Sequence, residues 1–178
     1  MTQPSRSRRI ANVYWTELSD DGWKIAVAAT DEGLAFVGSQ GRGSDELEAW
    51  AASRFGEGGY VLVNDEIVTA PYREQLADYL QGNRTTFDVA TDLSGGTAFQ
   101  RDVWNAMNAV GYGNTATYSD IAARVGKPSA VRAVGAAIGR NPVLIVLPCH
   151  RIVGKSGALT GYRGGLDMKE RLLRLESR

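Results

Sequence analysis

Two side chains that often take part in chemistry lie next to each other in this sequence. Cys149 is the only cysteine and His150 the only histidine among the 178 residues. The thiolate is the attacking species and a free thiol has a pKa of about 8.5, so a reactive cysteine needs a nearby base or positive charge. His150 and Arg151 could supply these. The pair predicts nucleophilic sulfur chemistry, and the alternative is a buried, unreactive cysteine beside a hydrogen-bonded histidine.

The segments around this pair should hold the sulfur in place. The apolar residues 143–147 have the length and composition of a buried strand, which Pro148 would end. Asn141 lies just before this segment, where its side chain could tie the Cys149 turn by hydrogen bonds to the backbone. Residues 161–165 form a glycine-rich loop in which backbone groups can approach a ligand.

A helix-turn-helix is predicted between residues 118 and 139. Residues 118–125 and 130–139 have the pattern of two short helices, joined by a tight turn over 126–129. The second helix carries almost only small residues, from which Arg132 projects. Small side chains let a backbone approach another surface, which could be a protein core or a nucleic-acid groove. The single arginine among these small residues favours a helix that binds DNA over one that packs in a protein core.

Composition excludes several kinds of protein. Basic and acidic residues balance at 20 each, so DNA binding must come from a local patch and be sensitive to salt. A single cysteine excludes an internal disulfide and suits a reducing compartment, so we expect a cytoplasmic protein. No segment approaches the roughly 20 apolar residues of a membrane helix. The segment after Arg6, Arg8 and Arg9 is too short and polar for a signal peptide.

The overall pattern predicts an α/β protein with two domains. Residues 1–91 should form a small α/β domain with an antiparallel sheet, and residues 92–178 a mostly helical domain that contains the helix-turn-helix. Strands are expected over 12–16, 24–30, 34–38 and 87–89, and helices from Ser44 and over 71–81. Thr97 and Gln100 fit a capping box that starts the first helix of the second domain.

Longer motifs resemble the O6-alkylguanine-DNA alkyltransferases, DNA-repair proteins that move an alkyl group from damaged guanine onto their own cysteine. The sequence Pro148-Cys149-His150-Arg151-Ile152-Val153 is similar to the family's active-site signature. The other matching segments follow in the family's order through the C-terminal half: Gly96 to Gln100 with Val103-Trp104, Thr117 to Ala122, Arg132 to Gly135, Asn141-Pro142, Gly161-Tyr162, and Lys169, Leu172, Leu173 and Glu176.

The resemblance implies a single-turnover reaction without a cofactor. An alkyl group would move irreversibly from O6 of guanine, and also from O4 of thymine, to Cys149. His150 would draw the thiol proton through a water molecule, and Glu176 would hold the imidazole in the right tautomer. Tyr118 would donate a hydrogen bond toward a purine ring nitrogen as the base leaves. The alternatives are a solvated carboxylate at Glu176 and a helix-end tyrosine packed on its neighbour at Tyr118.

The resemblance also implies how the substrate is bound. The partner would be double-stranded DNA, bound by a monomer through the minor groove, with Arg132 filling the gap left by an extruded base. Other DNA contacts are expected from Ala133, Gly135, Ala136 and Arg151, and the substrate pocket from Ile138, Ile152, Gly161, Tyr162 and Arg163. Some relatives have a serine at the position of Arg163. Some relatives also carry zinc. This sequence has only one cysteine and one histidine, too few to form a structural zinc site, so no metal is expected.

Two other classes of function are alternatives to alkyl transfer. A cysteine hydrolase could employ Cys149, His150 and Glu176, but it would leave the helix-turn-helix without a role, and a chromogenic ester would reveal it. A non-enzymatic lesion binder would resemble the alkyltransferase-like proteins. Those proteins have tryptophan in place of the cysteine, whereas Cys149 is present.

Overall fold

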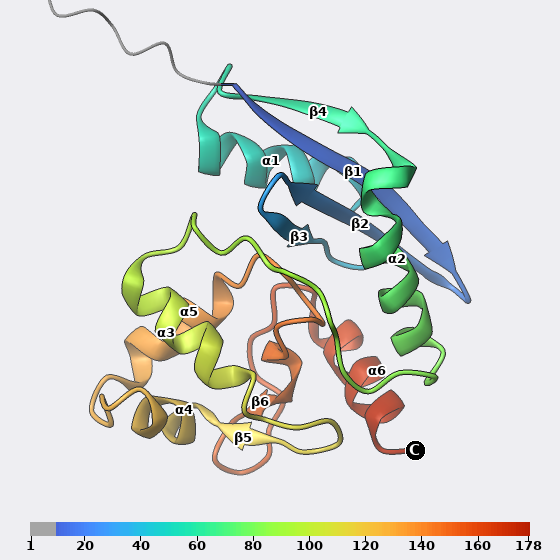
Figure 1. Ribbon diagram of the computed structural model, residues 1–178. Helices are drawn as coiled ribbons and strands as arrows, with labels where there is room; N and C mark the ends of the chain where they lie inside the picture. Colours follow the sequence, from blue (N-terminus) through green and yellow to red (C-terminus); the bar gives the residue numbers. More distant parts are fainter. Residues whose placement is uncertain (1–9) are drawn as a thin grey trace, which may run out of the picture.

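The computed structural model describes residues 10–178; Arg6, Arg8 and Arg9 lie outside them. The first half is a four-stranded sheet with two helices, and the second half is mostly helical (Figure 1). The elements of the first half are β1 (Ala11–Asp20), β2 (Trp23–Thr30), β3 (Gly33–Val37), α1 (Gly43–Phe55), β4 (Tyr60–Asn64) and α2 (Glu66–Leu80). Those of the second are α3 (Ala98–Met107), β5 (Ala116–Thr117), α4 (Tyr118–Arg124), α5 (Val131–Gly139), the 3-10 turn η1 (Cys149–Arg151), β6 (Ile152–Val153) and α6 (Leu166–Glu176).

The sheet is mixed, which corrects the expectation of an antiparallel sheet. Its strand order is β3-β2-β1-β4, and β1 pairs with β2 antiparallel but with β4 parallel. The sequence interpretation missed β4. Helix α1 connects β3 to β4 and crosses the sheet between them. Strand β4 can therefore run parallel to β1.

The two faces of the sheet pack against different partners. Side chains alternate along β2, so Ala26 and Ala28 join a small cluster with Leu47 of α1. Ile25 and Val27 point to the other face, where they belong to the main core with α2 and the C-terminal half. The main core therefore contains residues from both halves.

Three predicted elements differ from the structure. The apolar segment 143–147 is buried apart from the half-buried Val146, but within the described range 10–178 it makes only one β-bridge, Val37 to Val143, and then turns back on itself. Residues 87–89 form no strand, because the Gln75 side chain bonds both backbone groups of Asp88 at 2.9 and 3.1 Å. The helix expected over 71–81 begins earlier, at Glu66, because Asp65 caps it.

The local signals of the second half are confirmed. Thr97 and Gln100 form the capping box that begins α3. The two helices of the helix-turn-helix are α4 and α5, and Thr117 and Asp120 form a second capping box at the start of α4. None of the helices in residues 10–178 is long and apolar enough to cross a membrane.

A buried ion pair fixes the segment that connects the halves. Arg54 on α1 donates to the Asp92 carboxylate at 2.7 Å, and the two side chains are 10% and 4% exposed. Thr30 also donates to this carboxylate at 2.6 Å. Burial alone would raise the pKa of Asp92, but these hydrogen bonds and that of Ser94 outweigh it and lower the pKa to about 2.

We expect Asp92→Asn to lower the free energy of unfolding by about 3 kcal/mol, because the buried Arg54 guanidinium would lose its compensating charge. Urea unfolding at pH 7 measures this. Glu170→Gln is the matched control, since it breaks an exposed pair with Arg174 and should change stability by less than about 1 kcal/mol. Equal effects of the two substitutions would contradict a structural role for the buried pair.

Candidate active site

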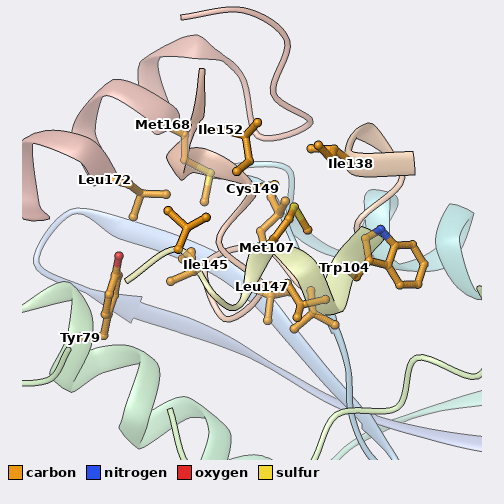
Figure 2. Close-up of a cluster of buried hydrophobic side chains, with 14 of the residues drawn as sticks. Tyr79, Trp104, Met107, Ile138, Ile145, Leu147, Cys149, Ile152, Met168 and Leu172 are labelled. Atoms are coloured by element: carbon orange, nitrogen blue, oxygen red, sulfur yellow. The ribbon is translucent and has the colours of Figure 1, made fainter. Parts of the chain in front are cut away.

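Cys149 lies on a 3-10 turn inside the main core. It begins η1 directly after Pro148 and is 4% exposed. Figure 2 shows it among Met107, Ile138 and Ile152, which belong to the same buried cluster. The fully buried Asn141 donates from Nδ2 to Cys149 Sγ at 3.0 Å and to the Leu147 carbonyl at 2.9 Å. Asn141 therefore contacts both the turn and the sulfur.

The environment keeps the Cys149 thiol protonated at rest. Burial raises its pKa, and the hydrogen bond from Asn141 and the charges of Arg163 and Lys169 oppose this only in part. A buried thiol of this kind needs a base at the moment of reaction.

His150 is placed to be that base. It is fully buried, and its Nε2 lies 2.8 Å from Glu176 Oε1. Burial lowers the pKa of His150 while the neighbouring Glu176 carboxylate raises it, and the net shift is downward, so the ring is neutral at pH 7. Because Nε2 faces a carboxylate, it carries the proton. Nδ1 is buried without a hydrogen-bond partner among the described residues, and its lone pair is free to take a proton.

Glu176 is a buried carboxylate rather than a solvated one. It is 4% exposed at the end of α6, and both of its oxygens accept from the Arg151 guanidinium at 2.9 to 3.1 Å. The Gly113 amide also donates to Oε2 at 3.1 Å. Burial alone would raise the pKa of Glu176, but the hydrogen bonds from His150 and Arg151 lower it to about 2. The carboxylate is therefore ionised at neutral pH.

The structure corrects the expectation that Arg151 contacts DNA. Its side chain is 8% exposed, and besides Glu176 it donates to the Val110 carbonyl at 2.6 Å. A guanidinium engaged in this way inside the protein is not available to a phosphate. Its role is to compensate the charge of Glu176.

One residue of the site was missed by the sequence interpretation. Tyr79 of α2 is fully buried, and its hydroxyl donates to Glu176 Oε1. The phenol oxygen of Tyr79 also lies 3.3 Å from His150 Nε2. None of the site residues predicted from the sequence lies in the first half. Local sequence carries no signal for this contact, because it forms only when the two halves pack together.

The helix-turn-helix presents the expected surface. Arg132, Ala133 and Ala136 are exposed on α5, and Arg132 forms no ion pair with any residue in the range 10–178. Gly135 lies beneath the Tyr118 ring, which is 3.7 Å from where a Cβ would stand. The Tyr118 hydroxyl donates to the Thr160 carbonyl at 3.0 Å. Tyr118 thus connects the helix-turn-helix to the loop that precedes α6.

That loop also borders the Cys149 cluster. Gly161 is exposed, whereas the Tyr162 hydroxyl is buried without a hydrogen-bond partner among the described residues, and burial and the nearby Cys149 raise its pKa. The buried Lys169 donates to the Thr160 carbonyl at 3.1 Å and to Ile152 at 2.5 Å. The loop is therefore held close to the sulfur.

Arg163 points elsewhere than expected for a pocket contact. Its guanidinium donates to the Glu46 carboxylate of α1 and to the carbonyls of Val37, Asn141 and Pro142 at 2.8, 3.1 and 3.2 Å. With these donors engaged, Arg163 ties the loop to the first half. Of the residues expected around the substrate, Ile138 and Ile152 are buried and belong to the same apolar cluster as Cys149 (Figure 2).

A buried cysteine with a histidine and a carboxylate, next to an exposed helix-turn-helix, is the arrangement expected of a DNA-binding protein with a nucleophilic cysteine. No group of three or more metal-binding side chains occurs within residues 10–178.

Comparison with known proteins identifies the family. The profile for the ribonuclease-like domain of 6-O-methylguanine DNA methyltransferase matches residues 13–93, and the profile for its DNA binding domain matches residues 98–178. The chain therefore belongs to the 6-O-methylguanine DNA methyltransferase family.

Individual relatives cover nearly the whole chain. The inducible methylated-DNA–protein-cysteine methyltransferase of Bacillus subtilis is 51% identical over 166 residues, 93% of this chain and 91% of that protein. The corresponding protein of Methanosarcina acetivorans is 42% identical over 155 residues, 85% and 90% of the two chains. The crystal structure of Mycobacterium tuberculosis O6-methylguanine methyltransferase has a TM-score of 0.75 at 34% identity, covering 93% of each chain. The structure of the M. tuberculosis protein in complex with DNA has the same TM-score at 33% identity, covering 93% and 92%.

The shifted pKa values of the site predict that stability falls in acid. Glu176 has a pKa of about 2 in the folded protein against an ordinary 4.5, so its contribution is complete above pH 4.5 and is lost as the pH falls through about 2. The pKa of His150 is also lowered, so its contribution to the stability of the folded protein declines as the pH falls below its ordinary pKa of 6.5. We expect Glu176→Gln to lose less stability between pH 4.5 and 3 than the wild type does. Urea unfolding at both values measures this, and equal losses in the two proteins would contradict the assignment.

Proposed function

We propose that the protein is a methylated-DNA–protein-cysteine methyltransferase whose acceptor is the sulfur of Cys149. The observation that carries this proposal is the neutral, buried His150 beside the buried thiol, with its Nδ1 free and its Nε2 fixed by Glu176. The substrate is O6-alkylguanine in double-stranded DNA, with O4-alkylthymine as a second substrate. The protein acts in the cytoplasm as a monomer.

The reaction is a displacement at the alkyl carbon. The bond from carbon to Cys149 sulfur forms as the bond from carbon to guanine O6 breaks. His150 accepts the thiol proton at Nδ1 through a bridging water, because adjacent side chains point apart. Tyr118 donates toward a ring nitrogen of the departing purine, so the base leaves without a full negative charge. For this step the Tyr118 hydroxyl must give up its hydrogen bond to the Thr160 carbonyl and donate to the base instead.

The balance of atoms requires no cofactor and makes the reaction single-turnover. His150 takes the thiol proton and releases it to water, while the departing guanine gains one proton in place of the alkyl group. Protons therefore balance overall, and the product on the protein is a thioether. A thioether offers water no good leaving group, so each molecule repairs one lesion.

The burial of Cys149 determines how DNA must be bound. At 4% exposure the sulfur cannot reach an atom inside a stacked duplex, so the damaged nucleotide has to be extruded. Helix α5 enters the minor groove with Ala133, Gly135 and Ala136 against the backbone, and Arg132 occupies the gap in the stack. Residues 92–178 form the domain that does this, and residues 1–91 the domain that supports it.

The mass of the protein after reaction tests the proposal. After incubation with an excess of O6-methylguanine oligonucleotide, we expect the intact mass to rise by one methylene group, and peptide mapping to place the gain on Cys149. Repair should stop at one lesion per molecule. Continued turnover, or methyl groups on other residues, would contradict the proposed reaction.

Arg132→Ala should slow repair of duplex DNA at least tenfold, because without the inserted side chain the extruded state loses an interaction that offsets a few kcal/mol of lost stacking and pairing. Reaction with free O6-benzylguanine needs no extrusion and should keep its wild-type rate. Arg174→Ala removes an exposed arginine from α6 and serves as the control on both substrates. If Arg132→Ala slowed both substrates equally, the insertion role would be wrong.

A further inference from the structure

Tyr79 brings the first half of the chain into the proposed relay. It lies in the last turn of α2, and its ring packs on Phe87 and Tyr112 with centroids 5.1 and 5.9 Å away. Figure 2 shows the ring rising from α2 with its hydroxyl pointing away from that helix, on the side of Leu172 and α6. The hydroxyl meets Glu176 and His150, and no solvent reaches it.

The direction of the hydrogen bonds around this hydroxyl is determined. Burial and the Glu176 charge raise the pKa of Tyr79, so the phenol keeps its proton at neutral pH. That proton goes to Glu176 Oε1, the closest acceptor. The lone pairs of the phenol oxygen then face His150 Nε2 at 3.3 Å. While the phenol donates to Glu176, its oxygen acts as an acceptor toward Nε2.

Nε2 of His150 therefore faces two acceptors, the Glu176 carboxylate and the Tyr79 oxygen. A proton on Nε2 satisfies both. If the proton moved to Nδ1, the lone pair on Nε2 would face the lone pairs of both oxygens. The pair of acceptors thus favours the tautomer in which Nδ1 is free to accept the thiol proton, and it stabilises the imidazolium that follows.

We propose that Tyr79 is a positioning residue for alkyl transfer: its hydroxyl, together with Glu176, fixes the tautomer of His150 and stabilises the ring once it has taken the thiol proton. This inference rests on the proposed function. It assigns the first half a direct part in the reactivity of Cys149, through a side chain that touches neither the sulfur nor the DNA.

Other ionisable groups surround the cluster and must be the same in the wild type and in Tyr79→Phe. They are Cys149 and Arg151 on η1, Lys169 on α6, Tyr112 before β5, Tyr162 and Arg163 in the loop before α6, and Arg178 at the chain end. Tyr79→Phe leaves all of them unchanged. It also keeps the ring that packs on Phe87, so a melting curve should show a folded protein.

The test uses the pH dependence of Cys149 labelling by iodoacetamide, which is specific because the chain has one cysteine. Tyr79→Phe should label about threefold to tenfold more slowly at pH 7, the effect of one hydrogen bond, and the midpoint of its pH profile should move upward. Tyr112→Phe is the matched control. It removes a hydroxyl from the same aromatic cluster, one that among residues 10–178 bonds only the Leu175 carbonyl at 3.4 Å, and should label as the wild type does.

A second comparison separates positioning from packing. In a His150→Ala background, Tyr79→Phe should have no further effect on labelling, because the ring through which it acts is gone. The same loss in both backgrounds, or a wild-type pH profile in Tyr79→Phe, would overturn the proposal. These results do not depend on DNA. A wild-type protein that labels as expected but takes no methyl group from O6-methylguanine DNA would contradict the proposed function and leave the role of Tyr79 in place.

Discussion

The architecture of the site depends on one buried carboxylate. An ionised Glu176 inside the protein is stable only if hydrogen-bond donors replace the water it has lost. The donors come from separate parts of the chain: Arg151 and His150 on η1, the Gly113 amide before β5, and the Tyr79 hydroxyl on α2. Satisfying one charge therefore joins the last helix, the cysteine turn and the first half. The same bonds set the orientation and tautomer of His150.

Burial protects the nucleophile as well as positioning it. The raised pKa of Cys149 keeps the sulfur as a thiol, and the lowered pKa of His150 keeps the ring neutral. A thiol beside a neutral imidazole is less reactive toward passing electrophiles than a thiolate. In the proposed reaction, the proton moves only when an alkylated base is bound beside Cys149. This arrangement suits a protein that can use its cysteine only once.

The parts of the structure that sequence could predict are those governed by local chemistry. The capping box of Thr97 and Gln100, the two helices around residues 126–129 and the adjacency of Cys149 and His150 depend on residues a few positions apart. Asn141 was also found from its place in the chain, since it bonds the turn only a few residues ahead.

The parts that sequence could not predict depend on how the halves meet. An apolar run such as 143–147 reads the same whether it pairs as a strand or folds into a buried turn, and here the Asn141 side chain closes the turn. From the sequence alone, Arg151 is a reasonable candidate for a DNA contact. The structure shows instead that its guanidinium is engaged by Glu176. Nothing in the local sequence predicts the role of Tyr79, because its hydroxyl bonds Glu176, which lies far along the chain.

The tautomer of His150 tests the central claim most directly, and the chain has only this one histidine. In protein labelled with nitrogen-15 at histidine, NMR spectra recorded as a function of pH distinguish the two ring nitrogens. The buried Glu176 network predicts a neutral ring at pH 7 with the proton on Nε2 and a bare Nδ1, and a pKa below the ordinary 6.5. A proton on Nδ1, or an imidazolium at neutral pH, would contradict the account.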